Sequence, residues 1–239
     1  MMRRRLLVTI CVAGLAGTLA AQRPALLPDS VIAALAGELS GETAKRNLER
    51  IAGEHRMRGS RGFRRAAEHI VERLTAYGLT DAHIESFPAD GKRFYGSQRA
   101  RRPWDAEFAE LWLLRKRGAI WERAERLASW DAMPISLAQD SEGGQVTAGL
   151  VDVGDGTRES DYAGKDVRGK LVLVSQQPGS VQRLAVERFG AAGIVSSAQN
   201  QRTAWWGEDE NLVRWGHLGA FDTRPAFAFM ISLKQARAL

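Results

Sequence analysis

The chain has 239 residues, of which 44% are hydrophobic and 26% are charged, and its formal net charge at pH 7 is +6. This composition is typical of a globular protein with one large domain or two modest ones. Acidic and basic residues are mixed throughout, which argues against a dedicated nucleic-acid binder, and the single cysteine, Cys11, excludes an intrachain disulfide.

Residues 1–21 have the pattern of a secretory signal peptide. Three arginines, Arg3 to Arg5, precede an uncharged apolar run from Leu6 to Ala20, and Ala20 and Ala21 offer a signal peptidase the small residues it requires. The apolar run has about 15 residues, fewer than the roughly 20 of a membrane-spanning helix. We therefore predict an exported, periplasmic or extracellular protein that meets the membrane only transiently. Removing three arginines and no acid lowers its charge from +6 to +3.

Two helices are predicted between Ser40 and Gly78. Residues 40–43 favour a helix start, and a glycine- and arginine-rich connection over 53–62 separates the two helices. The second helix carries a complete apolar stripe at helical spacing, formed by Phe63, Ala66, Ala67, Ile70, Val71, Leu74 and Tyr77. Period-two alternation then predicts a strand at 83–87, and the absence of any period over 90–103 indicates a loop.

The second half of the chain is dominated by short apolar runs between glycines. We expect a strand at 111–114, a helix over 115–126 and a domain boundary between about 127 and 144. Beyond it, strands are predicted at 146–153, 171–174, 194–195 and 226–231, with a hairpin-type turn at Gly154–Gly156. A helix over 180–189 would complete a strand–helix–strand crossover, and another helix should begin at Ser232.

Three segments carry a resemblance to a known family. Arg58-Gly59-Ser60 separates the two helices, Asp166-Val167-Arg168-Gly169-Lys170 precedes a buried strand, and Gly190-Ala191-Ala192-Gly193 ends the helix that leads to the next strand. Together they resemble co-catalytic zinc exopeptidases related to bacterial leucine aminopeptidases and glutamate carboxypeptidases, in the branch that carries a protease-associated (PA) insert. The resemblance covers nearly all of residues 40–239.

The resemblance implies an α/β fold in which an incomplete N-terminal segment of a zinc-exopeptidase domain is followed by a β-rich α/β PA domain. The implied organisation is a signal peptide at 1–21, the peptidase segment at 26–126, the PA domain at 127–231, and the start of the return to the catalytic domain at 232–239. In this family the ligands of two zinc ions and the general-base glutamate follow the insert. We therefore assign no catalytic, cofactor-binding or metal-binding residue to this chain, and expect the chain as given to bind no zinc and cleave nothing.

The complete enzyme would hydrolyse a terminal residue of a peptide substrate with a zinc-activated water. The alternative is a free-standing, secreted PA-type module that binds peptides or proteins without catalysis. Aminopeptidase versus carboxypeptidase action, side-chain preference and oligomeric state stay open.

The histidines, arginines and tryptophans are the other candidate site residues. Among the four histidines, His55, His69, His83 and His217, only His69 shares a helical face with a nearby acid, Glu72, and one such pair cannot complete a zinc site. The arginines at 56, 58, 61, 64 and 65 could contact RNA, but the chain lacks stacking platforms and a focused basic face, so no nucleic-acid partner is expected. The resemblance implies that they pack under the catalytic domain, and ion pairs with acids of the later half are the alternative. Trp205, Trp206, Trp215 and His217 form the candidate substrate-cleft or interface residues, with core packing as the alternative interpretation.

Overall fold

The computed structural model describes residues 26–199, 209–221 and 223–239, which form two compact units. The described part of the first unit, residues 26–48, contains α1 (Asp29–Glu38) and most of α2 (Gly41–Ala52), which continues into the second unit. The Ser40 hydroxyl accepts a hydrogen bond from the Thr43 amide at 3.2 Å, so the predicted helix start is confirmed. Neither α1 nor α2 buries a residue.

The second unit, residues 49–239, begins with the end of α2 and with α3 (Arg61–Ala76), which is the second predicted helix. Ser60 caps α3 by accepting a hydrogen bond from the Phe63 amide at 3.1 Å. The predicted strand at 83–87 is wrong, because this segment has no strand partner among the described residues. The predicted loop at 90–103 is correct apart from a short antiparallel pair, β1 (Phe94–Tyr95) and β2 (Gln98–Arg99).

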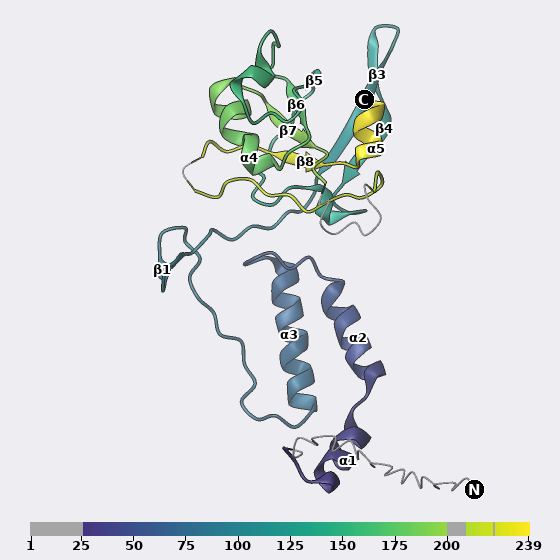
Figure 1. The fold of residues 1–239 in the computed structure, drawn as a ribbon, viewed down its shortest axis with the longest axis vertical. Helices are drawn as coiled ribbons and strands as arrows, with labels where there is room; N and C mark the ends of the chain where they lie inside the picture. Colours follow the sequence, from purple (N-terminus) through teal and green to yellow (C-terminus); the bar gives the residue numbers. More distant parts are fainter. Residues whose placement is uncertain (1–25, 200–208, 222) are drawn as a thin grey trace, which may run out of the picture. The chain divides into compact units, whose positions relative to one another are not determined.

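A long antiparallel hairpin follows, formed by β3 (Glu110–Arg117) and β4 (Ile120–Ser129) (Figure 1). The strand predicted at 111–114 is confirmed as part of β3, whereas the helix predicted over 115–126 is wrong. Gly118 has a φ of +61°, a conformation that glycine adopts without steric cost, and it reverses the chain here. The turn allows the charged residues of the two strands to pair across the ribbon.

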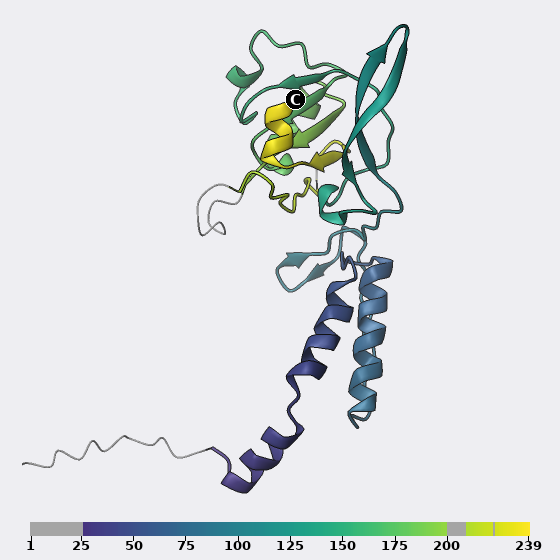
Figure 2. The ribbon, with the colours of Figure 1, turned by 90° about the vertical axis from the view of Figure 1, so that its right-hand side faces the viewer.

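The centre of this unit is a four-stranded parallel sheet in the order β5-β6-β7-β8 (Figures 1 and 2). Its strands are β5 (Leu150–Asp152), β6 (Leu171–Val174), β7 (Gly193–Ser196) and β8 (Ala228–Met230). The strand expected at 146–153 is therefore shorter than predicted. The turn at Gly154–Gly156 does not make a hairpin, because β5 and β6 run parallel.

The predicted crossover between 171 and 195 is confirmed. β6 leads into α4 (Pro178–Gln182), a π-helical segment η3 (Arg183–Arg188) follows, and the chain returns as β7. A short 3₁₀ helix η1 (Pro134–Ser136) follows the hairpin, another, η2 (Glu159–Tyr162), lies between β5 and β6, and α5 (Leu233–Ala238) begins after the Ser232 cap. The helix α5 confirms the prediction that a helix begins at Ser232.

Two of the three apolar clusters in the described part of this unit contain residues of the inner strands β6 and β7. The larger contains fully buried Val172, Ile194 and Ala228 together with Val181 and Ala185 from α4 and η3. The smaller cluster, formed by Leu171, Leu173, Val195 and Ile231, also receives Leu111 and Leu127 from the hairpin. The domain boundary predicted between 127 and 144 stays a prediction, although residues on both sides of it share this second cluster. The fold is a mixed α/β fold, as predicted, and no helix in the described part has the length and apolarity needed to cross a membrane.

Candidate functional site

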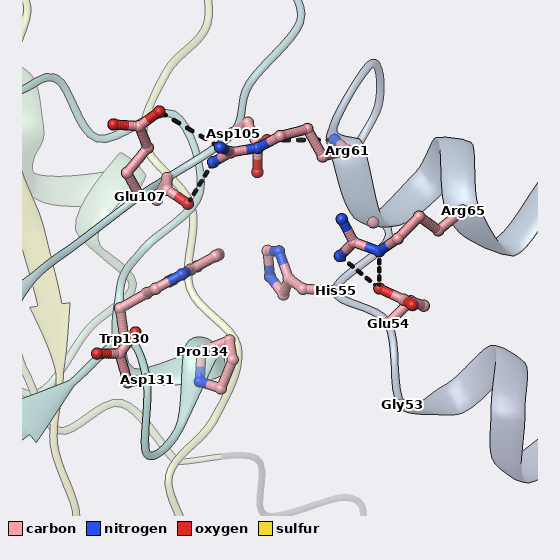
Figure 3. Close-up of a pocket in the computed structure, with 12 residues that line it drawn as sticks. Gly53, Glu54, His55, Arg61, Arg65, Asp105, Glu107, Trp130, Asp131 and Pro134 are labelled. Atoms are coloured by element: carbon pink, nitrogen blue, oxygen red, sulfur yellow. Dashed lines mark hydrogen bonds and ion pairs between the residues drawn. The ribbon is translucent and has the colours of Figure 1, made fainter.

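A cavity of about 370 Å³ lies where the connection between α2 and α3 meets the segments before and after the hairpin (Figure 3). Its walls come from residues 53–55, the first turns of α3, residues 105–107 and residues 130–134. Gly62 permits the close approach of α3, because a Cβ at this position would lie 2.4 Å from the carbonyl oxygen of His55. Close packing therefore requires glycine at position 62.

His55 projects into the cavity toward Trp130 (Figure 3). Its ring makes edge contacts with Trp130, at a centroid distance of 4.5 Å, and with Trp104, at 6.0 Å. The Nδ1 atom of His55 is buried and has no hydrogen-bond partner among the described residues. Burial lowers the pKa of His55 below its ordinary value, and the Asp105 carboxylate opposes this shift. A neutral imidazole at neutral pH follows.

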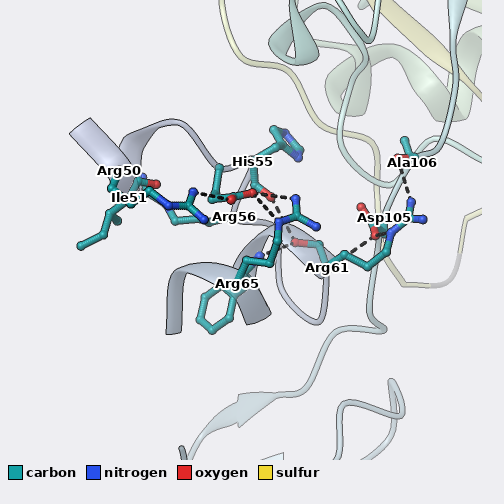
Figure 4. A network of polar contacts seen from close by, with 11 residues as sticks. Arg50, Ile51, His55, Arg56, Arg61, Arg65, Asp105 and Ala106 are labelled. Carbon is teal, nitrogen blue, oxygen red and sulfur yellow. Dashed lines mark hydrogen bonds and ion pairs between the residues drawn. The ribbon is translucent and has the colours of Figure 1, made fainter. Parts of the chain in front are cut away.

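The arginines around this cavity are held by acids (Figure 4). Glu54, whose side chain is only 9% exposed, accepts hydrogen bonds from Arg65 at 2.6 and 3.0 Å and from Arg50 at 2.7 Å. These hydrogen bonds, with that from Arg65 the stronger, lower the pKa of Glu54 to about 2. The carboxylate is thus ionised across the physiological range and neutralises part of the charge of both arginines.

Arg61 forms the second ion pair of the cavity. Its backbone amide and its Nε donate to Asp105 at 3.1 and 2.7 Å, and Nη1 lies 3.3 Å from Glu107. Burial alone would raise the pKa of Asp105, but the hydrogen bonds from Arg61 hold it below its ordinary value. Arg58 pairs with Asp140 and Arg64 with Glu68. The predicted ion pair with an acid of the later half is confirmed for Arg58 alone, because Arg61, Arg64 and Arg65 pair with acids of the first half. Arg56 instead donates to the carbonyl of Ile51 at 2.9 Å.

The structure brings Trp215 and His217 together but leaves the other two candidate tryptophans undescribed. The rings of Trp215 and His217 stack with a centroid distance of 5.0 Å and an interplanar angle of 22°. Trp215 is 40% exposed, so core packing does not describe it. Trp205 and Trp206 lie outside the described residues.

The stack lies beside the segment that leaves the carboxyl end of β6. The His217 carbonyl accepts a hydrogen bond from the Gly179 amide at 2.9 Å, and the Trp215 carbonyl accepts one from the Gln177 side chain at 3.3 Å. Gln177 Oε1 and His217 Nδ1 are both buried and have no partner among the described residues. Two unpaired acceptor or donor groups beside an exposed aromatic ring are features of a ligand-binding surface.

The charges around His217 favour its neutral form. Burial lowers the pKa of His217, nearby Arg101 and Arg214 lower it further, and Asp140 opposes the shift. Asp140 also receives Arg101 at 3.6 Å and has a φ of +66°. Neither Gln177 nor Asp140 was predicted from the sequence as a site residue. Gln177 could have been found from its place, shortly after a buried strand and directly before Pro178, where a helix begins.

The described residues do not fit a zinc site. His69 Nδ1 lies 3.9 Å from Glu72 Oε2, as the helical spacing predicted, and the side chain of Glu72 is 71% exposed whereas that of His69 is 17% exposed. Within residues 26–199, 209–221 and 223–239, no three histidine, cysteine, aspartate or glutamate side chains converge. No catalytic step is therefore assigned to a metal held by these residues.

Comparison with known proteins gives no assignment. No family model, no curated protein and no solved structure matches the chain.

Proposed function

We propose that this chain is the N-terminal and PA-domain portion of a secreted zinc-dependent exopeptidase, with residues 127–231 as the PA domain. In the complete enzyme, two zinc ions and the general base would be held by residues outside those described here. The role of the present residues is to shape the peptide-binding cleft. Residues 26–126 would supply the first helices and the hairpin of the peptidase portion.

One observation carries this proposal. Two of the three segments of the resemblance, 166–170 and 190–193, contact each other where the inner strands β6 and β7 begin: the Gly169 amide donates to the Gly190 carbonyl at 2.8 Å, and the Ala192 amide donates to the Lys170 carbonyl at 2.8 Å. Both Gly169 and Gly190 have a positive φ, near +70° and +75°. A whole crossover separates the two segments in sequence. Their contact in the fold therefore supports the interpretation that both belong to one structural motif.

The Trp215–His217 stack supplies the peptide-binding role within this proposal. An exposed tryptophan buries a large area on binding at a small entropic cost, and a neutral imidazole can donate to or accept from a peptide group. Gln177 Oε1 is buried beside the stack and has no hydrogen-bond partner among the described residues.

The test begins with the native polypeptide isolated from its source. Its mass establishes whether further residues accompany this 26.3 kDa sequence, and release of terminal amino acids is measured on peptides with free ends. We expect cleavage that a zinc chelator abolishes and that added zinc restores. In this enzyme Trp215→Ala should raise KM about tenfold with little change in kcat, because it removes binding shared by substrate and transition state.

Trp121→Ala is the matched control, since Trp121 lies on the hairpin tip and is also exposed. A native polypeptide that matches the present sequence in mass, binds peptides and releases no amino acid would replace the enzyme by the free-standing binding module. Cleavage that persists without zinc would overturn the proposal outright.

A further inference from the structure

The distal half of the β3/β4 hairpin has no covering element in the described structure. Its base is held in the core, where Leu111 and Leu127 pack against the smaller apolar cluster and Ala128 is buried. Every residue from Arg115 to Arg126 is exposed, and in both ribbon views this end of the hairpin extends away from the four-stranded sheet (Figures 1 and 2). Because an isolated two-stranded ribbon is only marginally stable in water, a surface that covers it would stabilise it.

The tip of this hairpin is apolar on both faces. Gly118 and Ala119 form the turn, and the next two residues, Ile120 and Trp121, are 65% and 60% exposed. Successive side chains of a strand point to opposite faces, so Ile120 and Trp121 project from different sides of the ribbon. Tryptophan is enriched at the interface between membrane and water, because its ring is apolar and its N–H is polar.

Positive charge lies directly behind the apolar tip. The register places Arg117 opposite Ile120 and Lys116 opposite Trp121, and Arg115 follows. Residues 115–126 contain five basic and two acidic side chains, a local charge of +3, which equals the charge of the whole chain without residues 1–21. Of the basic residues, Arg117 lies 3.8 Å from Glu122, and Arg123 and Arg126 lie 3.7 and 3.2 Å from Glu110, outside this range. No ion pair links Arg115 or Lys116 to another described residue, so the unpaired charge lies next to the tip.

We propose that the tip of the β3/β4 hairpin binds the surface of membranes that contain anionic phospholipids. Ile120 and Trp121 enter the interfacial layer, and Arg115, Lys116 and Arg117 contact the lipid phosphates. The transient membrane contact predicted from the sequence concerned the signal peptide, residues 1–21, and not the hairpin. The charge of an anionic membrane attracts basic residues only within a Debye length, about 8 Å at physiological salt. The attraction therefore depends on the local charge of the hairpin tip and not on the net charge of the chain.

A nucleic acid fits this tip less well than a lipid surface. Binding to single strands commonly uses several aromatic platforms, yet the second tryptophan of the hairpin, Trp112, is already covered by Arg123, whose guanidinium carbon lies 5.0 Å from the ring centroid. Ile120 and Trp121, the apolar pair at the outermost position of the hairpin, would have no role in contacting phosphates. The membrane proposal does not depend on the proposed peptidase function, because the hairpin tip and the Trp215–His217 stack share no residue.

The experiment places an environment-sensitive fluorophore at the tip of the full chain. Cys11→Ser removes the only native cysteine, and Ala119→Cys provides the attachment site. A control protein carries the fluorophore at Lys165→Cys, a position on the exposed surface of the same unit. Both are titrated with vesicles of phosphatidylcholine alone, with vesicles containing 30% phosphatidylglycerol, and with a double-stranded and a single-stranded oligonucleotide. The local probe separates hairpin binding from association through the apolar N-terminal run.

We expect a fluorescence increase and blue shift at position 119, absent at position 165, with the anionic vesicles and much less with phosphatidylcholine. Each of Arg115→Gln, Lys116→Gln and Arg117→Gln should weaken binding about fivefold, and Trp121→Ala by about tenfold. Trp215→Ala should leave vesicle binding unchanged. An unchanged probe at position 119 while the protein sediments with vesicles would overturn the proposal. A response to an oligonucleotide but not to vesicles, or an equal response to both kinds of vesicle, would overturn it as well.

Discussion

The His55 imidazole lies edge-on to the Trp130 indole, with a centroid distance of 4.5 Å and an interplanar angle of 79°. This contact joins the connection after α2 to the segment after β4. It also places a titratable ring among aromatic carbon, where the charged form is poorly solvated, and the buried Nδ1 has no hydrogen-bond partner in the described structure. Protonation of His55 therefore works against folding.

Acidification should reduce stability through His55. Its folded pKa lies below the ordinary value of 6.5, so the unfolded chain binds the proton more tightly. The contribution of neutral His55 to the free energy of unfolding is fully present above pH 6.5 and is lost as the pH falls through the pKa of the folded state. His55→Phe keeps the ring contact and removes the titration, so its urea midpoint should decline less than that of wild type between pH 7 and pH 5. An identical decline in both proteins would show that His55 is not the group responsible. The remaining dependence should include His217, whose pKa burial also lowers.

The stability of the protein should also depend on pH through Glu54, in a more acidic range. Hydrogen bonds from Arg65 and Arg50 lower its pKa from 4.5 to about 2. The stabilisation is present above pH 4.5 and is lost as the pH falls through 2, because the folded state then has to bind a proton. Glu54→Gln should be less stable than wild type at pH 7, and the difference in urea midpoint should shrink progressively below pH 4.5.

Glu107→Gln is the control for this variant. Its carboxylate faces Arg61 at 3.3 Å but its side chain is 84% exposed, and exposed ion pairs contribute little to stability. A loss of stability at pH 7 as large in Glu107→Gln as in Glu54→Gln would contradict the argument from shielding and multiple hydrogen bonds.

The strands of the sheet were predictable because each is a short apolar run, and β5, β6 and β7 begin at or within two residues of a glycine. The crossover helix has its own apolar face. Val172 and Ile194 were placed correctly in strands for this reason. The hairpin strand β4 was not, because its residues from Glu122 to Arg126 are all exposed and carry no apolar alternation. Only the pairing with β3, a long-range hydrogen-bonded contact, makes this segment a strand. Residues 83–87 show the reverse: the sequence alternates, but the segment has no strand partner within the described parts of the chain.

The candidate site was partly predictable from residue type alone. Trp215 and His217 stood out as an uncommon pair, and their alternate spacing is compatible with the observed stack. The cavity around His55 could not be predicted, because Asp105 and Trp130 are remote from it in sequence and no local pattern links them. Ion pairs such as Arg61 with Asp105 depend on the folded path of the chain.

Substitution of Gly62 should disturb the cavity directly. A Cβ at this position would lie 2.4 Å from the His55 carbonyl oxygen, which is a backbone atom and has little room to move. Gly62→Ala should therefore destabilise the protein by about 1–3 kcal/mol, as overpacking does. Gly53→Ala is the matched control, because the nearest atom to its Cβ would be 3.5 Å away. Equal unfolding free energies for the two variants in urea would contradict this account of the packing.

Alanine variants of two isoleucines compare how much the buried sheet and the exposed hairpin tip contribute to the stability of the second unit. Ile194 on β7 is fully buried, whereas Ile120 on the hairpin tip is 65% exposed. Ile194→Ala removes buried carbon and leaves a cavity, so it should lower the unfolding free energy by about 2–5 kcal/mol. Ile120→Ala should change it by less than about 0.5 kcal/mol. The comparison is made by urea unfolding, followed by near-ultraviolet circular dichroism. A large loss for Ile120→Ala would mean that the hairpin tip packs against protein in solution, which would also remove the basis for its contact with a membrane surface.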